Sequence, residues 1–144
     1  MQAGFLGIIS NPEFPDRVKI MMWDELPKSR TQEFGEAIRY ITKYNDILAA
    51  KTHIHNALNN QLLDADHNLY RATIIKAIAA IESNDDLRQE KIWVDSELNK
   101  EDLLSIEELT LRNRQRKKRT DFIIQLVGFT ALAFLALNFF TSIV

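Results

Sequence analysis

Apolar side chains recur along much of the chain at intervals of three and four residues, which is the spacing of an amphipathic helix. Val18, Met22 and Leu26 repeat in this way between residues 15 and 26. Further sets of the same spacing follow over 31–63, 69–81 and 87–98. The pattern predicts a chain of short helices, each with one apolar face turned towards a common core.

Residues that form turns are scarce after the first part of the chain. All three prolines lie within the first 27 residues, and after Lys28 glycine occurs only at Gly35 and Gly128. A protein of strands and tight turns would be expected to have more of both. We therefore expect an all-α fold, a small helical bundle in the cytoplasm whose last helix continues into a single C-terminal transmembrane helix.

The pattern divides the chain into four parts. We expect an irregular apolar N-terminal segment over residues 1–14 and a soluble helical domain over 15–98. An acidic-to-basic juxtamembrane helix follows over 99–121, with Asn99 and Asp102 in a capping arrangement at its start. Residues 122–144 form the expected tail anchor.

The last 23 residues, from Phe122 to Val144, contain no charged side chain. A helix needs roughly 20 apolar residues to cross a hydrocarbon core about 30 Å thick. The segment is long enough, and burying a charge there would cost roughly 2.5–3.5 kcal/mol. This predicts a tail-anchored, single-pass membrane protein.

A basic collar precedes this segment. Its members are Arg112, Arg114, Arg116, Lys117, Lys118 and Arg119. Basic residues next to a span stay on the cytoplasmic side, where anionic lipid headgroups attract them. We therefore expect the N-terminus to be cytoplasmic, or topologically equivalent, and the C-terminus to lie on the far side.

Small and polar residues share one face of the expected span. Gln125, Gly128, Leu132 and Ala136 lie within about one face at 100° per residue. Such a face allows another helix to approach closely, so it predicts packing against other subunits or self-association.

The charge of the body is uneven. Residues 82–111 carry ten acidic and three basic side chains. Two interpretations remain open, a solvated helix face and a docking surface for a basic partner.

The sequence offers little catalytic chemistry. Cysteine is absent, and neither a GxSxG, a P-loop nor a GxGxxG motif occurs. The weak candidates for a metal site are His53, His55, Asp66 and His67. They are weak because His53 and His55 are two residues apart, and such residues point to opposite sides of a helix. We expect no catalytic residue, metal or cofactor, and no nucleic-acid partner, since the basic collar lies next to the expected span.

These observations predict a non-enzymatic, tail-anchored structural subunit, adaptor or assembly factor of a membrane complex. Its expected partners are other subunits of that complex and anionic lipid headgroups at the basic collar. The alternative is a membrane-active oligomer, such as a phage or viral holin or pore former, assembled through the span. Layout alone does not decide between them.

Overall fold

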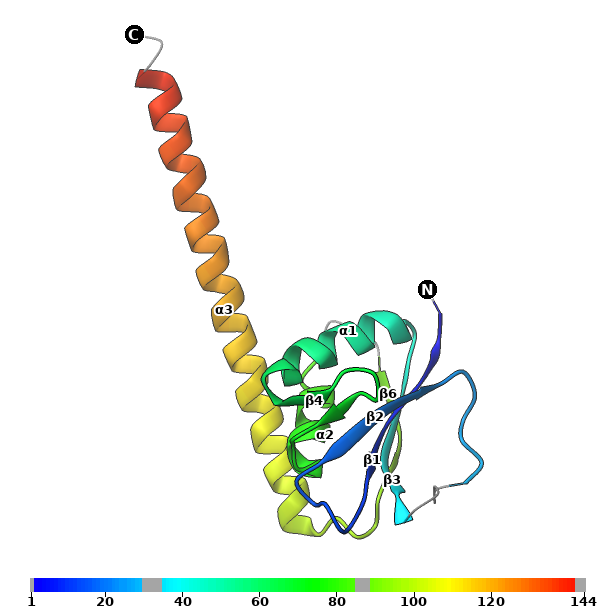
Figure 1. Cartoon of the computed structure of the whole chain (residues 1–144). Helices are drawn as coiled ribbons and strands as arrows, with labels where there is room; N and C mark the ends of the chain where they lie inside the picture. The colour runs from blue at the N-terminus through cyan, green and yellow to red at the C-terminus, as the bar shows by residue number, and fades with distance from the viewer. Residues whose placement is uncertain (1, 30–34, 85–88, 142–144) are drawn as a thin grey trace.

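A computed structural model describes residues 2–29, 35–84 and 89–141, and its elements include both strands and helices (Figure 1). In chain order they are β1 (Gly4–Ser10), β2 (Val18–Trp23), β3 (Ala37–Tyr44), α1 (Ile47–Leu58), η2 (Asn59–Gln61), β4 (Leu62–Asp64), β5 (Leu69–Tyr70), α2 (Ile74–Glu82), β6 (Gln89–Val94) and α3 (Lys100–Thr141). The prediction of an all-α fold is therefore wrong.

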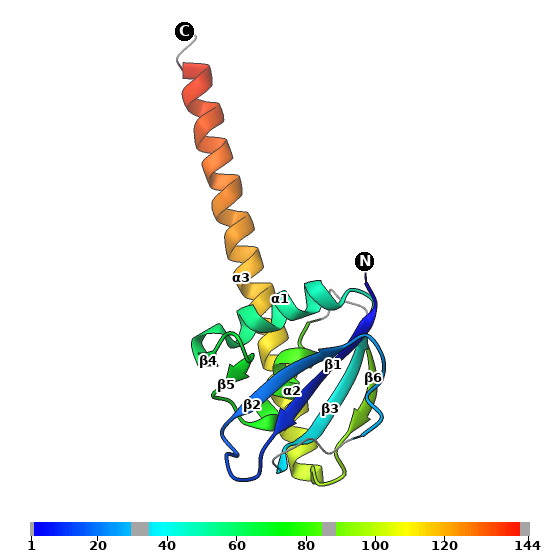
Figure 2. The same ribbon diagram turned by 45° about the vertical axis from the view of Figure 1, so that its right-hand side comes forward.

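The strands form one six-stranded antiparallel sheet in the order β4-β5-β2-β1-β3-β6. The first strand in the chain is thus central, hydrogen-bonded to β2 on one side and β3 on the other. Figure 2 shows these strands side by side, with α1 and α2 on one face of the sheet. Residues 4–10, which we expected to be irregular, lie in the middle of the fold.

The apolar pattern of β2 explains the incorrect helix prediction. Val18 and Met22 are four residues apart, as on a helix, but Ile20 lies between them and completes an alternation of period two. Val18, Ile20 and Met22 all pack in the core beneath the helices, while Lys19 and Met21 take the other face. A period of two is that of a strand, and β-branched residues favour it.

The same alternation places two tyrosines of β3 in the core. Tyr40 and Tyr44 are fully buried on the side of the helices. The Tyr40 hydroxyl donates to Glu82 Oε1 at 3.2 Å, and the Tyr44 hydroxyl donates to the Ile81 carbonyl at 3.3 Å. Both bonds attach β3 to the C-terminal end of α2.

A hairpin loop shows why the low glycine content was misleading. Residues 65–68 join β4 to β5, and Asn68 takes a positive φ of 49°, a conformation that glycine usually supplies. The Asp64 side chain accepts hydrogen bonds from the backbone N–H groups of Asp66 and His67 and so holds the loop closed. An asparagine and an aspartate here replace the expected glycine or proline.

Helices α1 and α2 begin at side-chain caps. Asp46 accepts a hydrogen bond from the Ala49 N–H at 3.0 Å, and Thr73 accepts one from the Lys76 N–H at 3.3 Å. Residues 77–81 of α2 are all buried, because the helix lies between the sheet and α3. Helix α2 therefore lies at the centre of the packed part of the molecule, which consists of the sheet, α1, α2 and the N-terminal part of α3 and which we call the head.

Helix α3 starts as the sequence predicted. The Asn99 side chain accepts from the Asp102 N–H at 2.8 Å, and the Asp102 carboxylate accepts from the Asn99 N–H at 3.1 Å. From Lys100 the helix runs unbroken to Thr141. Its N-terminal part packs along α2, and the rest projects away from the head (Figure 1).

The described part of the chain contains no helix that is both long and apolar enough to cross a membrane. The uncharged stretch with continuously described side chains runs from Phe122 to Leu135, which is about 21 Å of helix against a core of about 30 Å. Residues 142–144, and the side chains at 136, 137 and 139–141, lie outside the description. This finding contradicts the predicted single-pass, tail-anchored membrane localisation.

A second apolar cluster lies on the face of the sheet opposite the helices. Ile9, Ile38 and Ile41 are buried there, partly covered by Trp23 and Trp93. The Trp23 ring lies so close to Gly7 that an added Cβ would stand 2.6 Å and 2.9 Å from two of its ring carbons. Gly7 is therefore required for close packing of the indole against the sheet.

We expect Gly7→Ala to lower the free energy of unfolding by about 1–3 kcal/mol, as in other overpacked cores. Chemical denaturation monitored by tryptophan fluorescence measures this. Gly128→Ala is the matched control, because a Cβ there meets nothing within 4 Å and should leave the stability of the head unchanged. Equal stability of the two variants would show that the Trp23 ring does not lie on Gly7.

The buried tyrosines predict sensitivity to alkali. Burial, and secondly the charge of Glu82, raise the pKa of both Tyr40 and Tyr44 well above the ordinary value. A tyrosine in the unfolded chain loses its proton near pH 10, whereas the buried phenol keeps its proton. The free energy of unfolding is therefore unaffected by these groups below about pH 10. Above it, each tyrosine lowers that free energy by up to about 1.4 kcal/mol per pH unit. Comparing unfolding of the protein and its Tyr40→Phe/Tyr44→Phe variant between pH 9 and 11 tests this. The variant should show the shallower decline, and identical slopes would contradict the burial of these phenols.

Candidate functional site

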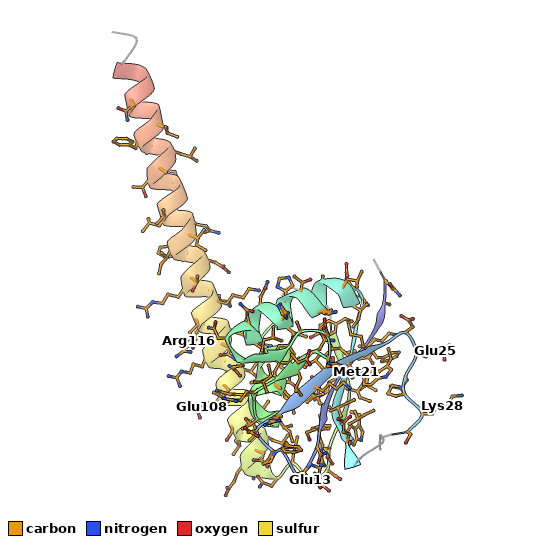
Figure 3. The ribbon with its side chains drawn as sticks, viewed as in Figure 1. Glu13, Met21, Glu25, Lys28, Glu108 and Arg116 are labelled. Carbon is orange, nitrogen blue, oxygen red and sulfur yellow. The ribbon has the colours of Figure 1, made fainter. Side chains whose placement is uncertain are left out.

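The surface of α3 beyond the head is the most unusual feature of the molecule. Its uncharged residues 122–135, which we call the apolar arm, point into open space (Figure 3). Nine large apolar side chains of the arm are between 52% and 75% exposed, namely Phe122, Ile123, Ile124, Leu126, Val127, Phe129, Leu132, Phe134 and Leu135. Exposed apolar surface of this extent marks an interaction site.

The apolar side chains surround the arm on every side. Successive helical residues are 100° apart, so Val127 and Phe129 point in nearly opposite directions, while Leu126 and Leu135 take the two sides between them. A helix that packs against a single surface would show one apolar stripe instead. The arm therefore differs from a helix with one apolar stripe.

The predicted packing face lies within this arm. Gln125, Gly128 and Leu132 are exposed, and no residue within 4 Å would meet a Cβ at Gly128. The side chain of Ala136, the fourth member, lies outside the described part. Close approach of another helix to this face, and self-association through it, stay predictions.

The basic collar has members with different surroundings. Arg114 is half-buried, and its Nη2 donates to the Glu82 carbonyl at 2.8 Å, which anchors α3 to the end of α2. Arg112, Arg116 and Lys117 line a cleft between α3 and the other two helices. Lys118 and Arg119 are exposed and do not line that cleft. Binding of lipid headgroups by the collar stays a prediction.

The weak metal candidates lie apart. His55 Nδ1 is 3.1 Å from the Tyr70 hydroxyl, whereas His67 Nδ1 is 2.9 Å from Asp64 Oδ2 in the hairpin loop. The hydrogen bond with His67 lowers the pKa of Asp64. Asp66 is exposed in the same loop, and His53 lines the cleft. Within residues 2–29, 35–84 and 89–141, no three histidine, aspartate or glutamate residues come together as a metal site.

The sequence did not indicate the cleft itself. Its other polar lining residues, among them Gln61, Lys76 and Asn84, come from separate elements and share no motif. Only the folded arrangement brings them beside the basic collar.

Comparison of the chain with protein-family models, with curated proteins and with solved structures gave no match. Any function therefore rests on the geometry of the molecule.

Arg114→Ala should lower the free energy of unfolding by roughly 1–3 kcal/mol, because it leaves the Glu82 carbonyl without its charged donor. Lys118→Ala, which removes one exposed charge four residues along the same helix, should change it by less than about 0.5 kcal/mol. Urea denaturation of both variants measures the difference. A loss that is equal in the two would show that Arg114 does not anchor α3.

Proposed function

We propose that this chain is a non-enzymatic subunit or adaptor of a multi-chain assembly, and that its apolar arm is enclosed by helices of partner subunits. The observation that carries the proposal is the exposure of large apolar side chains on all sides of the arm. The head provides a rigid base, because the N-terminal part of α3 is fixed to α2. The arm continues from this base as part of the same helix, as Figure 1 shows.

The energetics favour enclosure over contact on one side. Complete burial of the remaining exposed area would contribute roughly 1–2 kcal/mol for each large apolar residue. Contact along one third of the arm would then yield only about 3–6 kcal/mol, which the entropy of association, at about 4–15 kcal/mol, offsets. Burial of all nine side chains yields roughly 9–18 kcal/mol. Stable assembly therefore requires partners around most of the helix.

The polar residues of the arm fit this role. Gln125 presents an amide among apolar neighbours, and a facing helix would supply its hydrogen-bond partner. Gly128 offers a place where a partner backbone approaches closely. Together they would fix the register of an otherwise uniform apolar contact.

A photo-crosslinking amino acid placed at Val127 or at Phe129 in the full chain tests the proposal in cells. Because the two positions face opposite sides, enclosure predicts cross-links from both to the same small set of partner chains at fixed ratio. Leu48 is the control position, since it is 59% exposed on α1 and outside the arm. Three results would contradict the proposal. Cross-links could form from one arm position only, or they could join only copies of this chain. The third is that the protein is recovered with lipid and without any cross-linked partner chain.

Phe129→Gln/Leu132→Gln should reduce co-purification of these partners at least tenfold without lowering the melting temperature of the isolated protein, because neither side chain packs against the head. The matched control is Leu48→Gln/Leu104→Gln, whose residues are 59% and 58% exposed outside the arm. Quantitative mass spectrometry of the purified complexes measures both. Equal losses in the two double variants would show that general surface hydrophobicity, rather than the arm, holds the partners.

A further inference from the structure

A cleft of about 620 Å³, which we call the three-helix cleft, lies where α1, α2 and α3 meet. It is lined by the end of α1 and η2, by α2 and the two residues after it, and by residues 109–117 of α3. Figure 3 places Arg116 at this junction, where α3 leaves the head. The volume lies within the range of about 300–1,000 Å³ that is typical of small-molecule sites.

The charged residues that line the cleft are all basic within the described part of the chain. Lys76 of α2 and Arg112, Arg116 and Lys117 of α3 line it, and no described aspartate or glutamate does so. The net charge of the whole chain is −2, so this concentration of cations is local. Four cations around one concave surface raise the potential within it and attract anions.

Two amide side chains in the lining each have a buried polar atom without a hydrogen-bond partner in the described part of the chain. Asn84 is only 6% exposed, and its Nδ2 has no hydrogen-bond partner within the described part of the chain. Gln61 Oε1 is likewise buried and unsatisfied there. Buried polar atoms are almost always paired, and leaving one unpaired costs about 1–3 kcal/mol. A donor and an acceptor that have no partner in the described part of the chain thus belong to residues that line a cationic cleft.

We propose that the three-helix cleft binds a small phosphorylated molecule. Arginine guanidinium groups match the oxygen atoms of phosphate with paired N–H donors, so Arg112 and Arg116 are assigned to the phosphate. Asn84 Nδ2 donates to an oxygen of the ligand, and Gln61 Oε1 accepts from a ligand hydroxyl. The volume of the cleft exceeds that of a phosphate ion alone, which fits a phosphate carried on a sugar-sized group.

The binding site is independent of the proposed role of the arm. Its residues precede Phe122, and nothing in the cleft requires a partner chain. Occupation of the cleft would join α1 to the middle of α3 and so stiffen the base from which the arm projects. A loss of ligand binding would thus leave the cross-links of the arm in place.

Isothermal titration calorimetry of the full chain with inorganic pyrophosphate and with ribose 5-phosphate tests the proposal. Arg112→Gln/Arg116→Gln should weaken both at least tenfold, as expected from losing hydrogen bonds between charged groups. Lys118→Gln/Arg119→Gln removes the same charge from the same helix outside the cleft and should change the affinity less than threefold. Equal weakening in both variants would mean that general charge attracts the anion, and that would overturn the proposal.

The amides need a separate test. Asn84→Asp replaces the unpaired donor by a carboxylate of nearly the same shape and should weaken binding of pyrophosphate at least tenfold by repulsion. Gln61→Leu removes the acceptor and should weaken ribose 5-phosphate while leaving pyrophosphate, which has no hydroxyl of the sugar kind, unchanged. Absence of measurable binding of both probes to the unaltered protein, or unchanged affinity in the arginine double variant, would overturn the assignment.

Discussion

The packing of α3 against α2 is the contact on which the rest of the molecule depends. Helix α2 buries residues 77–81 because the sheet covers one side of it and α3 covers the other. Ile106 of α3 is 4% exposed in the main core, and Arg114 closes the C-terminal end of α2 through the Glu82 carbonyl. Without α3, an apolar side of α2 would face water. The long helix is therefore an integral part of the head as well as an extension of it.

Two features follow from that contact. Because α3 continues beyond the end of α2 without a break, its residues 122–135 leave the head with no neighbours to cover them. Because α1 lies near the same point, Arg112, Arg116 and Lys117 of α3 line a cleft together with residues of α1 and α2. One helix thus joins a buried segment, a cationic site and an exposed apolar arm in a single rigid element.

The sequence predicted those parts of the structure that local interactions determine. Asn99 and Asp102 are three residues apart, so their reciprocal cap depends on nothing distant, and it is confirmed. The absence of a breaker likewise predicted the unbroken course of α3. Residues 47–58 and 74–82 are helical, but the helix predicted over 31–63 also covered strand β3, and the one predicted over 69–81 also covered strand β5.

The sheet was missed because its evidence is not local. Val18, Ile20 and Met22 satisfy the helical and the extended period together, and only pairing with β1 decides between them. Register shifts between Ile8 and Ile9 and between Ile41 and Thr42 also interrupt the alternation that would have revealed the strands. The cleft was missed for a similar reason, since its residues come from three separate stretches of the chain. The basic collar was recognised, but its convergence with Lys76 and Asn84 required the tertiary fold.

Amide hydrogen exchange, measured on the chain in its native assembly and in isolation, shows whether partner helices enclose the apolar arm. The arm has no tertiary packing in the isolated chain, so its amides should exchange quickly there, while those of α2 exchange slowly in both states. We predict that residues 122–135 become strongly protected in the assembly and that the protection of the head changes little. Equally fast exchange of the arm in both states would show that no partner helices enclose it.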